Sequence, residues 1–348
     1  MNRTLSKGAR LGTAIFTAAL AAGMLTAVAA EETGADGTGG IGSQSSMTKS
    51  VLKDENTYAP NTTLNFTLTP GTGKPASGGQ PAIYDGIPGG VTLDSGDFVF
   101  APQDSDIGKA KVSSSNGITV HLEKFSKPGI YRYSVQETIP STPYDGLSYN
   151  TEPKTLDVYI SADREGCLNY TLIWTDADGC KGTGEFENTY ETGCFTVEKT
   201  VTGNQGDRNK TFSFTLKVDG AEGEQYKVLL PGGGTGTMVS GEEFTVTLKD
   251  SQTVKVYGLS ANDVYTVTED DYSSDGYSTT VSVNGGEAEE TRTTTGSVPK
   301  GGESCIDFTN CKEVTPPTGL LMDTAPYAAM IVLAGLFAIF LRRRRREE

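Results

Sequence analysis

Residues 61–68 (NTTLNFTL) and residues 209–216 (NKTFSFTL) lie far apart in the chain but share one alternating pattern. In each stretch Leu or Phe occupies every second position from the fourth onward, and polar residues stand between them. A period of two is typical of β-strands with one buried face. The same alternation, broken by Gly and Asp turns, runs through most of the chain, and helical periodicity is nearly absent. We therefore predict an all-β fold of antiparallel strands packed as β-sandwiches.

The alternating segments follow one plan twice. Val135-Gln136-Glu137 in the first half corresponds to Val267-Thr268-Glu269 in the second, and an Asp-Gly turn follows each. Each half ends on Phe-x-Asn, at residues 186–188 and 308–310. We predict one β-sandwich domain over residues 47–190 and another over residues 191–312.

The N-terminal segment has the features of an export signal. Basic residues are followed by an alanine-rich apolar run that ends in Ala27-Val28-Ala29-Ala30. This order predicts a secretory signal peptide over residues 1–30. Residues 31–46 are rich in Gly, Ser and Thr, which indicates a flexible leader.

The C-terminal segment has three parts in a fixed order. An apolar run at residues 325–341 is at the short end of what spans a bilayer, and the arginine block 342–346 after it is expected to stay cytoplasmic. We therefore predict a transmembrane segment and basic tail over residues 320–348. Residues 313–319 hold a pentapeptide that resembles a sortase sorting signal, usually LPxTG, made here of Thr315, Pro316, Pro317, Thr318 and Gly319. Such an enzyme would cut between the last two residues. A plain anchor with a Pro-rich linker is the alternative.

Composition excludes several classes of function. The chain has 348 residues and a formal net charge of −15, which argues against nucleic acid as a partner. Its single histidine makes a histidine-dependent active site improbable, and no pair of cysteines has metal-ligand spacing. The sequence shows no catalytic dyad, phosphate loop or metal cluster. We expect no enzyme activity on another substrate, no cofactor and no metal.

Six polar residues stand in phase with the apolar faces of the predicted strands. A buried lone Lys or Glu is costly, so such groups are almost always paired or neutralised. Side chains that turn out to water at strand ends would be the simpler explanation, but the same three residue types recur in the same order in both halves. The residues are Lys49, Glu137 and Asn188 in the first half and Lys199, Glu269 and Asn310 in the second. Lys53 is a rival to Lys49, but its neighbour Glu55 is charged.

This pattern predicts an internal cross-link in each half. If the first and last strands of a half lie side by side, with lysine and asparagine adjacent in the core, desolvation lowers the lysine pKa and raises the glutamate pKa. The neutral amine can then attack the asparagine, while the glutamic acid polarises the amide carbonyl and passes a proton to departing ammonia. The product is a Lys–Asn amide that ties the two ends of the domain together.

The sequence resembles the backbone pilins of Gram-positive bacteria, of the streptococcal FctA type. The resemblance is carried by KFSKPGIY from residue 124, GDRNK at 206–210, VTEDDY at 267–272 and IDFTN at 306–310. It implies two tandem Ig-like (CnaB-type) sandwiches, each with an isopeptide bond promoted by a glutamate. Carried over by position, the bonds join Lys49 to Asn188 and Lys199 to Asn310.

The same resemblance implies covalent polymerisation and a place at the cell surface. In such pilins a sortase transfers the threonine acyl group to a lysine of the next subunit, and the matching residues here are Thr318 and Lys181. The implied partners are the sortase, neighbouring copies of the chain, minor tip or base pilins and peptidoglycan. The precursor would be membrane-inserted, and the product would be a wall-anchored pilus. A monomeric wall-anchored adhesin or stalk with the same domains is the alternative.

The five cysteines allow one pairing from spacing. Cys194 lies five residues before Lys199, and Cys305 lies five residues before Asn310. If those strands are parallel and level, Cys194 and Cys305 form a disulfide or a close thiol pair. A bond between Cys167 and Cys180 is possible, and Cys311 would remain unpaired.

Overall fold

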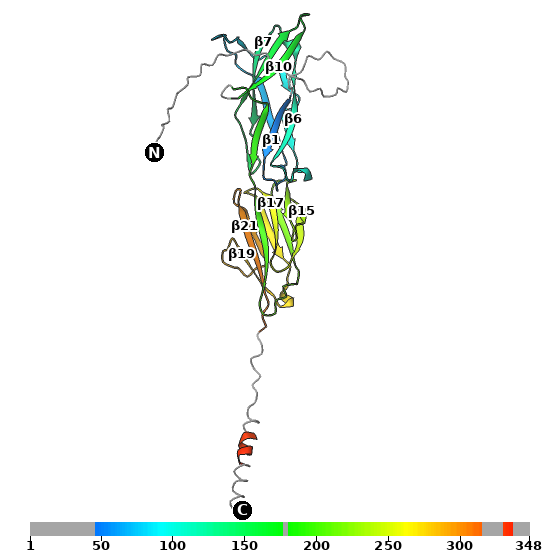
Figure 1. The fold of residues 1–348 in the computed structure, drawn as a ribbon, viewed down its shortest axis with the longest axis vertical. Helices are drawn as coiled ribbons and strands as arrows, with labels where there is room; N and C mark the ends of the chain where they lie inside the picture. The colour runs from blue at the N-terminus through cyan, green and yellow to red at the C-terminus, as the bar shows by residue number, and fades with distance from the viewer. Residues whose placement is uncertain (1–45, 177–179, 315–329, 337–348) are drawn as a thin grey trace, which may run out of the picture. The chain divides into compact units, whose positions relative to one another are not determined.

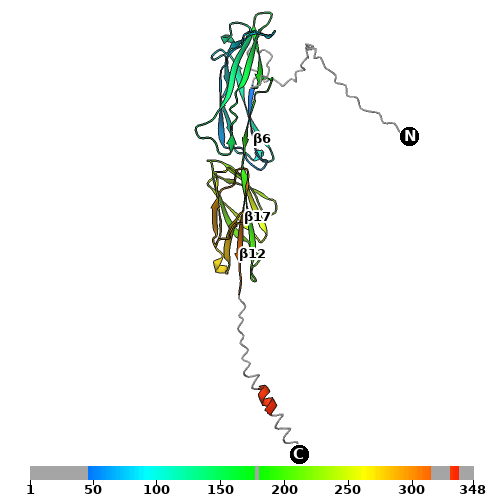
Figure 2. The same ribbon diagram turned by 90° about the vertical axis from the view of Figure 1, so that its left-hand side faces the viewer.

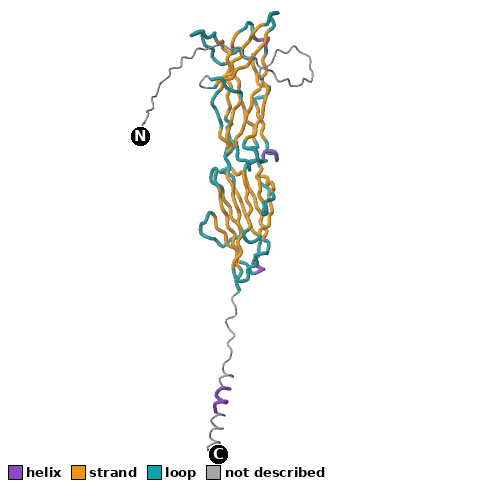
Figure 3. The backbone as a smooth tube through the Cα atoms, viewed as in Figure 1, coloured by secondary structure: helices purple, strands orange, loops and turns teal. Residues whose placement is uncertain are grey.

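The computed structural model describes residues 46–176, 180–314 and 330–336 (Figures 1 and 2). Strands dominate these residues (Figure 3), so the prediction of an all-β fold is confirmed. The helical parts are residues 330–336 and three 3-10 turns, η1 (Asp104–Asp106), η2 (Leu122–Lys124) and η3 (Ser273–Asp275).

Several predicted segments fall outside the described residues. These are the signal peptide, the leader up to residue 45, and the whole TPPTG motif. Of the predicted transmembrane segment, only residues 330–336 are described. Within the described part of the chain, no helix is both long and apolar enough to cross a membrane.

Residues 46–190 form two sheets, which we call the N-terminal sandwich. The first has the strand order β4 (Val91–Leu93), β6 (Lys111–Val120), β1 (Ser46–Leu52), β11 (Glu185–Tyr190) and β8 (Leu147–Ser148). The second has the order β10 (Leu168–Thr175), β9 (Lys154–Ala162), β7 (Gly129–Thr138), β2 (Thr62–Pro70) and β5 (Asp97–Phe100), with β3 (Ile83–Asp85) paired to β7.

Residues 193–311 form a second pair of sheets, the C-terminal sandwich. One sheet has the order β15 (Thr235–Val239), β14 (Gln225–Leu229), β17 (Gln252–Leu259), β12 (Gly193–Thr202), β21 (Glu303–Cys311) and β19 (Ser278–Val283). The other has the order β16 (Glu243–Leu248), β13 (Phe212–Asp219), β18 (Val264–Glu269) and β20 (Thr293–Gly296). The adjacent strands β12 and β17 are labelled in Figure 2.

In each sandwich the first and last strands are parallel neighbours. β1 pairs with β11, and β12 pairs with β21. Parallel strands cannot be joined by a tight turn, so the rest of each domain forms the connection between them. The first and last strands of each sandwich therefore lie side by side inside one sheet, and neither is an edge strand.

The two cores are separate hydrophobic clusters with no residue in common. Each combines apolar residues from both sheets of its own sandwich, as period-two alternation requires. Along β12, Phe195, Val197, Lys199 and Val201 are all buried, so the lysine occupies a core position. The alternation therefore brings a charged residue type into the core at a defined place.

Candidate functional site

The three polar residues of the N-terminal sandwich meet inside its core. Lys49 lies on β1, Glu137 on β7 of the facing sheet and Asn188 on β11, and none is more than 2 % exposed. Lys49 Nζ donates a hydrogen bond to Glu137 Oε2 at 3.0 Å, and Asn188 Nδ2 donates to Glu137 Oε1 at 2.7 Å. The two carboxyl oxygens thus face the two nitrogens that an isopeptide reaction exchanges.

The orientation of the Asn188 amide is set by a backbone group. The N–H of Asn150 donates to Asn188 Oδ1 at 2.9 Å. Because a backbone N–H can only donate, the atom facing it is the carbonyl oxygen, which leaves the amide nitrogen for Glu137. The expectation that the carboxyl group contacts the asparagine carbonyl is therefore wrong for this sandwich. No sequence pattern pointed to Asn150, since every non-proline residue carries the same N–H.

The corresponding residues of the C-terminal sandwich also meet in its core. Lys199 on β12, Glu269 on β18 and Asn310 on β21 are fully buried. Lys199 Nζ lies 3.2 Å from Glu269 Oε1 as an ion pair, and Thr279 Oγ1 donates to Glu269 Oε2 at 3.0 Å. Among the described residues, neither polar atom of the Asn310 side chain has a hydrogen-bond partner.

The register of the paired strands is the same in both sandwiches. Lys49 is level with Phe186, two residues before Asn188, and Lys199 is level with Phe308, two residues before Asn310. The prediction of adjacent parallel strands is confirmed, but the level register of lysine and asparagine that the cysteine pairing assumed is wrong. Residues two apart on a strand point to the same face, so the stagger leaves both side chains in the core.

Burial is the main influence on the pKa values of the two lysines. Desolvation lowers the pKa of Lys49, although the attraction of Glu137 opposes it, and lowers the pKa of Lys199 to about 8 against the attraction of Glu269. Aromatic rings provide part of the apolar surroundings, with Phe66 5.5 Å from Lys49 Nζ and Phe212 4.5 Å from Lys199 Nζ. In both sites burial shifts the lysine toward the neutral amine, which is the nucleophilic form.

Lys53, the rival to Lys49, faces a different environment. It is 7 % exposed, and its Nζ donates to the backbone carbonyls of Asp54, Thr57, Asp106 and Lys109 at 2.7–3.3 Å. Lys49, rather than Lys53, is the lysine that the fold brings to Glu137.

Lys181 lies at the surface after strand β10. It is exposed, and it forms an isolated bridge with Thr175, while the N–H of Gly182 donates to the carbonyl of Trp174. Its side chain is available to another molecule. Its expected partner, Thr318, lies outside the described residues.

The predicted pairing of Cys194 with Cys305 is wrong for this structure. All five cysteines are free thiols. Cys194 is level with Glu303, and Cys305 is level with Thr196, so the two cysteines are offset by two residues. Diagonal neighbours of this kind have Cα atoms about 8 Å apart. A disulfide requires a shorter separation.

Cys167 and Cys180 cannot pair within one chain either. They flank opposite ends of β10, whose eight residues extend about 26 Å. Cys311 is also free, on β21.

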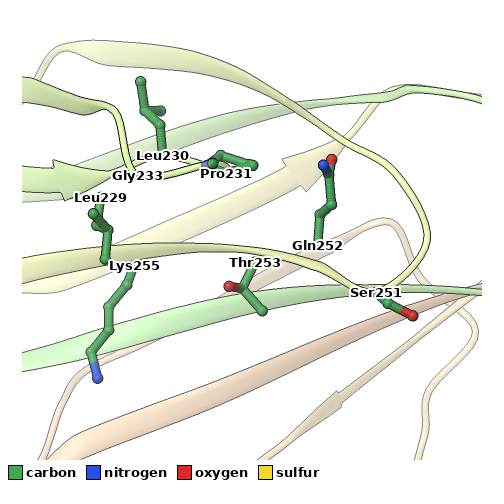
Figure 4. A pocket seen from close by; sticks show the side chains of 9 residues that line it. Leu229, Leu230, Pro231, Gly233, Ser251, Gln252, Thr253 and Lys255 are labelled. Carbon is green, nitrogen blue, oxygen red and sulfur yellow. The ribbon is translucent and has the colours of Figure 1, made fainter.

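The surface also has hollows, and hollows are where ligands usually bind. One hollow, of about 330 Å³, lies where residues 229–233 approach the start of β17, and its charged lining residue is Lys255 (Figure 4). That lysine forms an ion pair with Glu303 at 2.9 Å. Within the described ranges, no group of three His, Cys, Asp or Glu side chains could hold a metal ion.

Two family models divide the chain at the same place as the two sandwiches. Residues 46–191 match the "Spy0128-like isopeptide containing domain", FctA, and residues 193–312 match a domain of unknown function, DUF7601. A pilin of Streptococcus pyogenes serotype M1 is 31 % identical over 329 residues, which cover 87 % of this chain and 91 % of the pilin. The chain belongs to the FctA-type pilin family.

Solved structures agree with this membership. The crystal structure of the major pilin from S. pyogenes is similar with a TM-score of 0.55 and 26 % identity, and it covers 78 % of this chain and 100 % of the pilin.

The pilus tip adhesin Cpa of S. pyogenes is 34 % identical over 131 residues, which are 37 % of this chain but 18 % of the adhesin. The homologous pilins are structural subunits and not enzymes, as expected for this chain.

Proposed function

We propose that this pilin is a shaft subunit whose two sandwiches are each closed by an internal isopeptide bond, Lys49 to Asn188 and Lys199 to Asn310. The observation that supports this most strongly is the duplicated triad. Two buried Lys–Glu–Asn sets occupy corresponding strands of the two sandwiches in the same register, and in each set the amine and carboxyl groups lie within 3.2 Å of each other. Burying two such charged pairs costs desolvation free energy, and a reaction that converts each lysine into a neutral amide would remove that cost.

The reaction needs no outside reagent. The neutral lysine amine attacks the asparagine Cγ, the glutamate takes a proton from the amine, and a proton is returned to the amide nitrogen. The Cγ–Nδ2 bond then breaks, and ammonia leaves. Folding holds the groups together, so the step is effectively unimolecular and has a high effective concentration.

Intact mass spectrometry tests both bonds at once. Protein covering residues 46–314 should be lighter than its formula weight by one ammonia, about 17 Da, for each bond formed. Digestion should then yield one branched peptide from each sandwich. Well-folded protein at its full formula weight would contradict the proposal.

The bonds would make the subunit resist pulling. Each closes a loop of more than one hundred residues, which the chain-entropy estimate values at about 5 kcal/mol of stability. Because the bonded strands are the first and last of each sandwich, tension applied to the two ends of one sandwich would pass along β1–β11 or β12–β21. The remaining strands would stay unloaded.

We also propose that subunits are joined by a sortase, through Thr318 of one copy and Lys181 of the next. The exposed position of Lys181 supports this assignment. Co-expression with the cognate sortase should give a ladder of covalent polymers on a denaturing gel. Lys181→Ala should abolish the ladder, whereas Lys124→Ala, at another exposed lysine, should not. A ladder that survives Lys181→Ala would exclude this acceptor.

Coverage of the relatives supports a shaft role over a monomeric adhesin or stalk. The chain matches 91 % of the pilin but 18 % of the tip adhesin. Anchoring to peptidoglycan and contact with tip or base pilins follow from this role and belong to the same proposal.

A further inference from the structure

We propose that the backbone N–H of Asn150 is a catalytic group of the N-terminal sandwich, acting as the oxyanion donor when Lys49 attacks Asn188. This inference rests on the proposed isopeptide reaction. The hydrogen bond from Asn150 N–H to Asn188 Oδ1, at 2.9 Å, contacts the oxygen on which negative charge develops. Donors already aimed at such an oxygen in a buried site are among the strongest contributors to catalysis of acyl transfer.

The length of the neighbouring strand explains why this N–H is available. β8 contains only two residues, Leu147–Ser148, and its last pairing to β11 joins Ser148 to Thr189. Asn150 lies beyond that pairing, so its N–H can reach a side chain. The Asn150 side chain also accepts a hydrogen bond from the N–H of Glu152 at 3.1 Å, a turn that holds the backbone in place before the reaction.

The C-terminal sandwich provides an internal comparison. There the corresponding strand β19 is six residues long and pairs with β21 from Ser278 to Val283, and Thr279 is level with Asn310. Within the residues the structure describes, Asn310 Oδ1 receives no hydrogen bond. The two reactions therefore differ in whether a donor faces the reacting carbonyl.

The donor acts at one defined step. As the bond between Lys49 Nζ and Asn188 Cγ forms, the carbonyl π electrons move to Oδ1, and the Asn150 N–H stabilises that charge. The electrons return when the Cγ–Nδ2 bond breaks. Glu137 gives back the proton it took, and ammonia departs, so the donor itself exchanges neither proton nor electron. Losing one donor of this kind slows acyl transfer about a hundredfold.

The first experiment compares the two bonds in unmodified protein. Unreacted chain, prepared in denaturant, is refolded at about pH 5.5, where Lys199, with a pKa of about 8, is protonated, and is then brought to alkaline pH. Samples quenched in acid are digested, and the two branched peptides are quantified against time. On the alkaline plateau of both rates, the Lys49–Asn188 bond should form at least about tenfold faster than the Lys199–Asn310 bond. An equal or slower N-terminal rate would overturn the inference.

The second experiment removes the donor itself. Asn150→Pro deletes the N–H, whereas Asn150→Ala keeps the N–H and removes the side chain as a matched control. We expect Asn150→Pro to form the N-terminal bond about a hundredfold more slowly than Asn150→Ala, with the C-terminal rate unchanged in both. Equal N-terminal rates in two folded variants would overturn the inference. If hydrogen exchange shows that the proline variant does not fold, the wild-type comparison decides.

These outcomes are distinct from failure of the proposed function. If wild-type protein forms no bond, the isopeptide proposal itself is wrong. If both bonds form but the two experiments give equal rates, only the role of Asn150 is lost.

Discussion

The two sandwiches hold the same three residues in the same register but surround them differently. In the N-terminal sandwich the asparagine is hydrogen-bonded at both ends, to Glu137 and to the N–H of Asn150. In the C-terminal sandwich the asparagine has no such partner among the described residues, and the added hydrogen bond goes to Glu269 from Thr279. The Lys–Glu–Asn set that the reaction requires is therefore present in both sandwiches. The donors that assist it, Asn150 N–H and Thr279 Oγ1, differ because the neighbouring strands pair differently.

The largest expected effect tests whether the two sandwiches react independently. Glu137→Gln should prevent only the N-terminal bond and Glu269→Gln only the C-terminal bond, because each carboxyl group pairs with the lysine of its own sandwich. Each variant should regain about 17 Da and lose about 5 kcal/mol of stability in its own sandwich, measured by denaturant unfolding. The double variant should lose both bonds. Loss of both bonds from a single substitution would show that the sandwiches are coupled.

The second prediction concerns pH. Burial lowers the pKa of Lys199 to about 8, so below that pH most of this amine is protonated and cannot attack. In the refolding assay, the rate of the C-terminal bond should rise about tenfold per pH unit up to roughly pH 8 and then level off. The pH at which the rate of N-terminal bond formation levels off reports the deprotonation of Lys49. A C-terminal rate that is flat between pH 6 and about 8 would mean that deprotonation of Lys199 does not limit the reaction.

The third prediction concerns the hydroxyl group that is present in only one of the sites. Thr279 holds one oxygen of Glu269 and leaves the other facing Lys199. Thr279→Val, of similar shape, should slow the C-terminal bond about tenfold by loosening the carboxyl group, while the N-terminal rate stays unchanged.

Thr279→Ser is the matched control, because it keeps the hydroxyl group and should react at close to the wild-type rate. A purely structural role for the residue would instead appear as equal slowing by valine and serine, or as an unchanged rate with lower stability.

The smallest expected effect concerns the cysteines of the C-terminal sandwich. Since Cys194 and Cys305 are offset in register and free, replacing either with serine should change stability by less than about 0.5 kcal/mol. Thiol labelling under denaturing conditions should count both as reactive without reductant. If Cys194→Ser instead lost several kcal/mol of stability, that result would support a disulfide between Cys194 and Cys305.

Sequence reasoning reached the fold class and the members of the triads because both leave a periodic signal. Period-two alternation predicts the strands, and a lysine at a core position, as Lys199 on β12, breaks the apolar rule visibly. It failed at the relative position of paired strands. The assumption that Lys199 and Asn310 are level also produced the incorrect cysteine pair. The alternation states which face a residue occupies but not which residue of the neighbouring strand lies beside it.

By itself, then, the sequence determined that each half would place a lysine, a glutamate and an asparagine on buried faces, because those faces follow from local periodicity. Only the tertiary structure decided the two-residue stagger, the direction of the Asn188 amide and the donors that serve each site. These depend on how far edge strands such as β8 and β19 extend, and therefore on which backbone groups are used in the ladder. Every non-proline residue carries the same backbone groups, so the sequence does not show which of them contact the site, and only the paired strands of the folded protein do.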